Sequence, residues 1–256
     1  MAAGYNPRFA WPIVIDSTND QFTFNEGGGA LVCDVLDSST VVGGAYFWRG
    51  DGTAADMCLA LKTALDTVGA HTYTVVLTTA GKLTISATGA FTLNWGTVAH
   101  DLPASLLGFV DADQVSVANA CVSDFHVGNA WFVQQITVDD TEDTESADTV
   151  ATRLENGRVR VAMYGNRLER SVTIDALPAF ETYQAEEALA QRSFGRFWTY
   201  ARTGGHFEYA PNSAVPGTYS SYQIADPTWL RRWPARLTPR VIRRYDVDFP
   251  MTRHVA

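Results

Sequence analysis

Residues 53–87 read TAADMCLALKTALDTVGAHTYTVVLTTAGKLTISA, and they decide the fold of the first half of the chain. In their first part, apolar residues recur every three or four positions, which predicts an amphipathic helix from Thr53 to about Val68. Thr53 is the expected N-cap, with Asp56 at the third helical position, and Gly69 ends the helix.

The second part of the same stretch predicts a β-hairpin. The segments Thr72–Thr78 and Lys82–Ala87 are rich in β-branched residues, and Ala80-Gly81 lies at the turn between them. Further strands are expected on both sides, at residues 13–15, 21–25, 30–36, 43–48 and 91–95, with a short helical turn at 102–109. Strands that surround one helix predict an α+β domain, with the helix packed on an antiparallel sheet.

The second half of the chain predicts a mainly β, sandwich-like domain with a helix across it. A helix is expected from Pro178 to about Arg192. Strands are expected at residues 158–164, 171–174, 194–200, 205–209 and 245–249.

Charge divides the chain into the same two parts. Residues 1–150 hold 4 basic and 18 acidic side chains, a net charge of −14, whereas residues 151–256 hold 15 and 10, a net charge of +5. Residues 139–150 are acidic and almost without large apolar groups, which is typical of a linker. We therefore expect an acidic domain at 1–138, a linker at 139–150 and an Arg-rich domain at 151–256.

Several classes of protein are disfavoured by composition. No apolar run is long enough to span a membrane, and the first residues lack the basic start and apolar middle of a signal peptide. So acidic a chain is an improbable nucleic-acid binder. The three cysteines, Cys33, Cys58 and Cys121, include no CxxC pair, and we expect them to be buried apolar residues.

The motifs that carry common catalytic chemistry are missing from the sequence. It contains no Walker loop, no HExxH and no G-x-S-x-G. An EF-hand loop started at Asp139 has Thr144 in place of the glycine and Val150 in place of the bidentate glutamate. We therefore predict no catalytic residues, no cofactor and no metal site. A pair of catalytic carboxylates, as in a glycosidase, remains an alternative, because such a pair is defined by its distance in space and not by its spacing in the sequence.

Three weaker candidate sites remain. The five histidines stand apart from one another, and His206, in a glycine turn beside aromatic residues, is the best candidate among them. Arg49-Gly50-Asp51 spells an adhesive tripeptide, but the position also requires a turn before the helix. The aromatic side chains of Trp198, Phe207 and Tyr209 form a possible platform for stacking on a sugar, with a core role as the alternative.

The best candidate interface lies between Trp229 and Arg244. Tryptophan and arginine are the residues most enriched at the energetic centres of interfaces, and Pro234 and Pro239 favour an extended chain. The alternative is an ordinary surface loop. The predicted interface residues are Trp229, Arg231, Arg232, Trp233, Arg236, Arg240, Arg243 and Arg244.

Two sets of segments carry a resemblance to known proteins. Ile15–Phe22, Met57–Leu61, Thr72–Val75, Gly81–Ser86, Phe91–Trp95 and Ser105–Phe109 together resemble N-terminal modules of structural proteins in tailed bacteriophages. Arg192–Phe194, Phe197-Trp198, Gly204–Tyr209, Tyr219–Tyr222 and Tyr245–Phe249 resemble distal-tail or baseplate-hub domains of phages, in which a tryptophan strand, a glycine turn and an aromatic strand follow in that order.

The resemblance implies a non-catalytic adaptor that forms a cyclic homo-oligomer and joins the tail tube to tip or fibre proteins. Such a protein is assembled in the bacterial cytoplasm and resides in the virion. The alternatives are a receptor- or carbohydrate-binding module of the particle, a capsid decoration or head-tail connector protein, and a cell-wall hydrolase.

Overall fold

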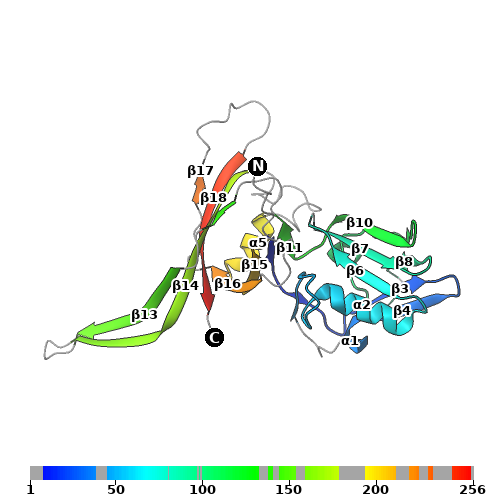
Figure 1. Cartoon of the computed structure of the whole chain (residues 1–256), viewed down its shortest axis with the longest axis horizontal. Coiled ribbons are helices and arrows are strands. Elements are labelled where there is room, and N and C mark those ends of the chain that lie inside the picture. Colours follow the sequence, from blue (N-terminus) through cyan, green and yellow to red (C-terminus); the bar gives the residue numbers. More distant parts are fainter. Residues whose placement is uncertain are drawn as a thin grey trace.

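The computed structural model describes residues 8–38, 45–79, 81–96, 98, 100–132, 138–140, 144–153, 159–178, 194–211, 219–224, 230–232 and 244–254. In these residues, buried side chains gather in two hydrophobic cores. The first core lies around helix α2 (Met57–Val68), on the right in Figure 1, and the second lies around helix α5 (Phe194–Ala201). The fold is mainly β, with antiparallel sheets and a packed helix, which confirms the predicted fold class.

Helix α2 buries one face in the first core, through Met57, Leu61 and Leu65 among others. The predicted helix is therefore confirmed, but the predicted N-cap is wrong. Asp56 is the N-cap, and its carboxylate accepts a hydrogen bond from the Cys58 N–H. The helix begins later than expected because Phe47 makes two backbone hydrogen bonds around Asp56: its N–H donates to the Ala55 carbonyl, and its carbonyl accepts from the Met57 N–H. These bonds hold the residues before Met57 in a turn.

Two antiparallel sheets enclose the first core. The predicted hairpin is confirmed, with Tyr73 opposite Ala87 and Leu77 opposite Leu83. Strand order is β10-β7-β6 in one sheet and β4-β3-β8-β9 in the other. Their strands are β3 (Gln21–Asn25), β4 (Ala30–Asp34), β6 (Tyr73–Leu77), β7 (Lys82–Ala87), β8 (Thr92–Asn94), β9 (Gln114–Val115) and β10 (Ala120–His126). Smaller elements complete this part: β2 (Ile13–Val14), α1 (Val35–Ser38), β5 (Ala45–Tyr46) and the 3₁₀ turn η1 (Ala104–Leu106).

A nine-stranded antiparallel sheet carries the second core. Its order is β11-β1-β15-β16-β18-β14-β12, with β13 also paired to β14 and β17 to β18. The strands are β1 (Arg8–Ala10), β11 (Ala130–Phe132), β12 (Val138–Asp140), β13 (Thr144–Arg153), β14 (Val159–Pro178), β15 (Phe207–Ala210), β16 (Ser220–Ile224), β17 (Leu230–Arg232) and β18 (Arg244–His254).

Strands β1 and β11 belong to this larger sheet, although the sequence places both in the acidic domain 1–138. Phe9 of β1 lies opposite Trp131 on one side and Tyr209 on the other. Three aromatic residues in adjacent strands stabilise this pairing, which no local pattern encodes. From Arg8 onward, the chain therefore passes through the second sheet, builds the first core and returns to the second sheet at β11.

The predicted linker 139–150 is also wrong in its described residues. Val138–Asp140 and Thr144–Arg153 are strands that pair along β14, with Asp139 opposite Thr173 and Val150 opposite Ala162. Acidic composition does not distinguish a linker from an edge strand, because charged residues are common on edge strands too.

The segment 194–200, predicted as a strand, is helix α5. Phe194, Phe197, Trp198 and Ala201 are all buried, and their spacing of three and four residues is that of a helix face. The density of aromatic residues favoured a strand, but the helical period prevails. The predicted helix from Pro178 to Arg192 lies outside the described residues except for Pro178, which ends β14.

Candidate functional site

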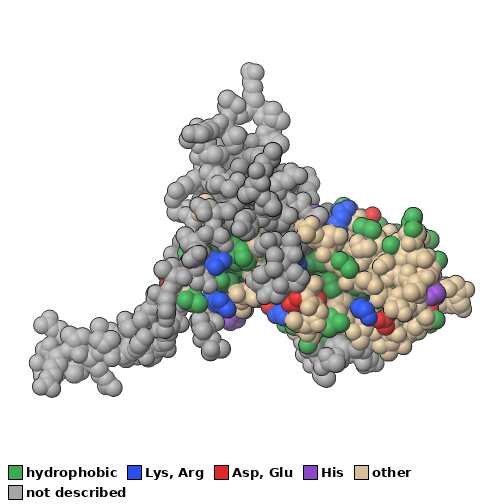
Figure 2. Space-filling model, viewed as in Figure 1, with side chains coloured by type: hydrophobic (Ala, Val, Ile, Leu, Met, Phe, Trp, Pro, Cys, Tyr) green, Lys and Arg blue, Asp and Glu red, His purple; other side chains and the backbone are tan. Residues whose placement is uncertain are grey.

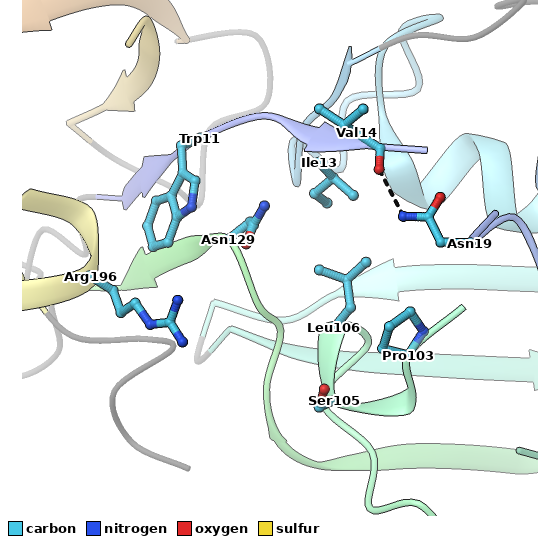
Figure 3. A pocket seen from close by; sticks show the side chains of 9 residues that line it. All are labelled: Trp11, Ile13, Val14, Asn19, Pro103, Ser105, Leu106, Asn129 and Arg196. Carbon is cyan, nitrogen blue, oxygen red and sulfur yellow. Dashed lines mark hydrogen bonds between the residues drawn. The ribbon is translucent and has the colours of Figure 1, made fainter. Parts of the chain in front are cut away.

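A cleft of about 290 Å³ lies between the two cores (Figure 3). Trp11 and Arg196 border it on the side of the second core, and residues before α1 and around η1 border it on the other side. The lining residues are Trp11, Ile13, Val14, Asn19, Pro103, Ser105, Leu106, Asn129 and Arg196.

Backbone and amide hydrogen bonds fix the walls of the cleft. The Trp11 N–H donates to the Asn129 carbonyl, and Asn129 Nδ2 donates to the Pro12 carbonyl at 2.8 Å. Asn19 Nδ2 donates to the Val14 carbonyl at 3.1 Å, as Figure 3 shows. The two asparagines therefore hold the segment Trp11–Val14 at both ends, and the cleft is preformed.

Arg196 gives the cleft its charge. It is the only ionisable side chain among the described lining residues, and it is exposed on α5. Trp11 stacks on Tyr200 of the same helix, with ring centroids 6.3 Å apart, and so presents a rigid apolar wall. A guanidinium beside apolar groups suits an apolar segment that carries a carboxylate. The described lining offers a binding surface without a paired acid and base.

A polar junction joins the two cores on β15. Arg49, in the loop before α2, forms an ion pair with Glu208: Nε donates to Oε2 at 2.8 Å, and Nη2 donates to Oε1. The Glu208 side chain is only 7% exposed, so the pair is shielded from solvent on one side. A bidentate guanidinium–carboxylate pair also fixes orientation. It therefore sets how the loop 47–56 lies against the second sheet.

Arg8 reaches the same loop from β1. Its residue is 2% exposed, and Nη1 donates to the Trp48 carbonyl at 2.8 Å. The Tyr219 ring lies 5.3 Å from this guanidinium, and its hydroxyl donates to the Arg49 carbonyl at 2.9 Å. Burial lowers the pKa of Arg8, and electrostatic interaction with nearby acidic groups, including the Asp56 carboxylate, partly offsets this effect. Burial likewise raises the pKa of Tyr219, so this hydroxyl stays protonated as a donor.

Asp56 organises the loop from inside. Its carboxylate accepts hydrogen bonds from the backbone N–H groups of Gly50, Gly52 and Cys58. Gly50 and Gly52 have φ of +69° and +71°, which an L side chain rarely adopts. The Arg49-Gly50-Asp51 tripeptide is thus part of a structural turn, and its arginine is bound to Glu208 rather than free for a receptor.

The three cysteines are free thiols and buried, as predicted. Burial raises the pKa of Cys121 to about 11 and raises those of Cys33 and Cys58 as well. Because the thiolate is the reactive form, these cysteines are poor nucleophiles at neutral pH.

The predicted aromatic platform is wrong as an exposed surface. Trp198, Phe207 and Tyr209 are 6%, 0% and 1% exposed, within the second core. Their rings pack against neighbours such as Phe197, whose ring meets that of Phe207 edge-on at 4.8 Å. The rings lie between helix α5, which carries Trp198, and strand β15, which carries Phe207 and Tyr209, and the apolar area that they remove from water favours this placement.

The other predicted site residues fall partly outside the described residues. Trp229, Trp233, Arg236, Arg240 and Arg243 lie there. The backbones of Arg231, Arg232 and Arg244 lie in β17 and β18, with Arg231 opposite Val247. His206 is exposed beside α5, and its Nε2 lies 2.9 Å from Gln223 Nε2.

Sequence reasoning missed the cleft and the junction. Arg49 and Glu208 are 159 positions apart, and neither belongs to a recognisable motif. The described residues include no group of three or more His, Cys, Asp or Glu side chains that could hold a metal ion. No described helix is long and apolar enough to cross a membrane.

Comparison with known proteins finds no family model and no curated protein that matches the chain.

Proposed function

We propose that this chain is a structural subunit of a bacteriophage virion, a distal-tail or tail-tip adaptor that forms a ring and joins the tail tube to tip or fibre proteins. The observation that carries the assembly role is the long hairpin of β13 and β14, which extends away from the rest of the molecule (Figure 1). We refer to the paired residues 146–153 and 159–167 as the arm.

The arm has the features of a contact element. In the described part of the chain, residues 159–166 of β14 pair only with β13, because β18 reaches β14 no further than Arg167. A two-stranded ribbon is marginally stable alone in water. No strand among the described residues pairs with its outer edges, whose backbone N–H and C=O groups are a template for a strand of another chain. Both properties favour an arm that becomes ordered against a neighbouring subunit.

The charge division supports contacts between copies. An acidic first half and an Arg-rich second half are complementary, and repetition of one such contact gives a head-to-tail arrangement that closes into a ring when the rotation permits.

The phage assignment rests on the resemblance of the sequence motifs, and the fold gathers several of them in one place. Phe197 and Trp198 of α5 pack in the second core with residues of β15 and β18, although the tryptophan segment is a helix here and not the strand that the resemblance implies. The burial of the rings predicted for a sugar platform removes the observation that would favour a carbohydrate-binding module.

Light scattering after size-exclusion chromatography, at several salt concentrations, tests the proposal, together with electron microscopy of the purified protein. We expect a discrete cyclic oligomer. A monomer at high micromolar concentration in low salt would contradict the ring.

An arm-shortened variant sharpens the test. Deletion of Thr149–Arg153 together with their partners Val159–Met163 removes matched pairs and keeps Asp148 opposite Gly165. We expect this variant to lose the oligomer and to retain the near-ultraviolet circular dichroism of the aromatic core. An unchanged oligomer would show that the arm is not the contact element.

A further inference from the structure

An apolar stripe of exposed valines lies on the outer face of the β10-β7-β6 sheet and at the turn that precedes β10. Figure 2 shows hydrophobic side chains at the surface near β10. Four valines in this region are strongly exposed: Val117 is 80% exposed, Val115 70%, Val122 55% and Val76 49%. Isolated exposed apolar side chains are normal, but contiguous ones mark interaction sites.

Strand register makes the stripe contiguous. Val117 and Ala120 exchange backbone hydrogen bonds across a tight turn, so they lie side by side on one face. Val115 lies two residues before Val117 and Val122 two residues after Ala120, so side-chain alternation directs each to the same side as its neighbour at the turn. Beyond the turn, β9 and β10 continue in different sheets. Val122 lies opposite Thr84 of β7, and Thr84 lies opposite Val76 of β6. We call Val76, Val115, Val117 and Val122 the valine surface.

Carboxylates border the valine surface. Asp111 and Asp113 are exposed in the loop before β9, and Asp124 shares the outer face of β10 with Val122. Asp124 Oδ2 also accepts a hydrogen bond from the Val110 N–H, which draws this loop towards β10. The surface is thus apolar with an acidic rim.

Few cations of the first half are available to neutralise this rim. Residues 1–150 contain only Arg8, Arg49, Lys62 and Lys82. Arg8 is buried and Arg49 binds Glu208 at the junction, while Lys62 pairs with Asp66 on α2. Lys82, opposite His126, is the one basic residue on the same sheet face. The valine surface therefore attracts a partner that is apolar and cationic.

We infer that the valine surface binds the segment Trp229–Arg244 of a second copy of this chain. That segment interleaves two tryptophans with six arginines, so it offers apolar anchors for the valines and guanidinium groups for the carboxylates. The inference rests on the proposed self-assembly and specifies which two surfaces meet. Because the two surfaces differ, the contact is head-to-tail, as a ring requires.

The position of the segment favours a second copy over its own chain. Its two ends are anchored on the second sheet, where β17 pairs with β18 and Arg244 begins β18. Figure 1 places β17 and β18 on the far side of α5 and β15 from β10. Both ends of the segment must therefore stay beside the second core, while the valine surface lies beyond the first.

A charge-swap experiment tests the inference. One variant carries Asp111→Arg and Asp113→Arg, and the other carries Arg236→Asp and Arg240→Asp. Each alone opposes like charges, so we expect its dissociation constant to rise by at least about tenfold. An equimolar mixture pairs each altered surface with its complement and each native surface with its own. The two variants then alternate around the ring, so a ring with an even number of copies should recover its wild-type mass in light scattering, and one with an odd number should recover open chains larger than the monomer.

A pair of valine variants isolates the apolar part. Val117→Glu with Val122→Glu adds charge at exposed positions and should abolish the oligomer without a change in circular dichroism. Val32→Glu, at an exposed position of β4, is the matched control and should leave the oligomer intact. An intact oligomer in the variant with Val117→Glu and Val122→Glu would overturn the inference, and so would a mixture of the two charge-swap variants that stays monomeric. The ring proposal would stand in both cases. A monomeric wild-type protein would contradict both the ring proposal and the inference. If the two valine substitutions lower the stability of the monomer and leave the oligomer unchanged, the chain's own segment covers the valine surface.

Discussion

The two cores differ in how far along the chain their parts lie from one another. Around the first core, hairpins such as β6–β7 join neighbours in sequence, and helix α2 lies immediately before them. Around the second core, β1 lies between β11 and β15, so residues 9, 131 and 209 meet in one row. The first core is thus built from local patterns, whereas the second depends on long-range pairing that only the folded chain reveals.

Their packing differs as well. The first core mixes aliphatic and aromatic side chains with small residues of α2. The second is dominated by rings, with Phe9, Trp131, Phe194, Phe197 and Phe207 each no more than 1% exposed. Each ring buries a large apolar area, so loss of one side chain should affect the second core most.

The largest effect is therefore expected for Phe197→Ala. The Phe197 ring contacts those of Phe9, Trp131, Phe207 and Phe249, all within 6.0 Å between centroids. Its truncation should lower the free energy of unfolding by about 4 kcal/mol in urea titrations. Thr199→Ala, at an exposed position of the same helix, is the control and should change stability by less than about 0.5 kcal/mol. Equal effects would mean that the rings are not a packed core.

The next effect concerns the connection between the cores. Arg49→Leu leaves Glu208 buried without its cation and should cost about 3 kcal/mol. Arg49→Leu with Glu208→Leu removes both charges and should recover part of that loss. Because the pair joins the loop before α2 to β15, we expect Arg49→Leu alone to unfold in two steps. Circular dichroism and tryptophan fluorescence measure these transitions. One shared transition would show that other contacts couple the cores.

A smaller effect distinguishes the two possible caps of α2. Asp56→Ala removes three acceptor contacts to backbone N–H groups and should cost about 2 kcal/mol. Thr53→Ala should cost less than about 0.5 kcal/mol, because the Thr53 hydroxyl caps no helical N–H and makes only exposed hydrogen bonds, to Arg49 and Asp51. Thermal unfolding of the two variants gives the comparison, and a larger effect at Thr53 would restore it as the cap.

These caps illustrate what sequence can predict. Local periodicity was sufficient for α2 and for the hairpin β6–β7, because neighbouring residues determine both. It failed at residues 194–200, where the apolar spacing of a helix was obscured by aromatic residues typical of strands. The linker prediction failed because an edge strand and a linker have the same acidic composition.

The candidate site was less predictable than the fold. The Arg49–Glu208 pair and the cleft at Trp11 and Arg196 form only when distant segments meet, so no spacing in the sequence encodes them. The burial of Trp198 and Tyr209 has a similar origin, since composition alone does not distinguish a core ring from an exposed one.

The free energy of unfolding should depend on pH through Glu26, which lies beside Tyr73 of the first core. Burial opposes ionisation of Glu26, but hydrogen bonds from the Ala70 N–H, the Tyr73 hydroxyl and the His71 N–H outweigh it and lower its pKa. A carboxyl with a lowered pKa stabilises the fold fully above its unfolded value near 4.5 and loses that contribution as pH falls. Glu26→Gln should therefore flatten the fall in unfolding free energy below pH 4.5. An identical pH profile for both proteins would contradict this role.

The smallest effect lies in the turn between β9 and β10, beside the valine surface. Ala118 and Asn119 have φ of +51° and +61°, and Val117 and Ala120 exchange backbone hydrogen bonds around them. Positive φ at both central residues defines a type I′ turn, in which glycine is preferred at the second position. Asn119→Gly should thus raise the free energy of unfolding by about 0.5 kcal/mol, whereas Asn119→Val should lower it by more, because a β-branched residue is strained there.

Since neither change alters the exposed valines, the oligomer should persist in both variants. Its loss in Asn119→Gly would show that the turn itself, rather than the valine surface, contacts the neighbouring copy.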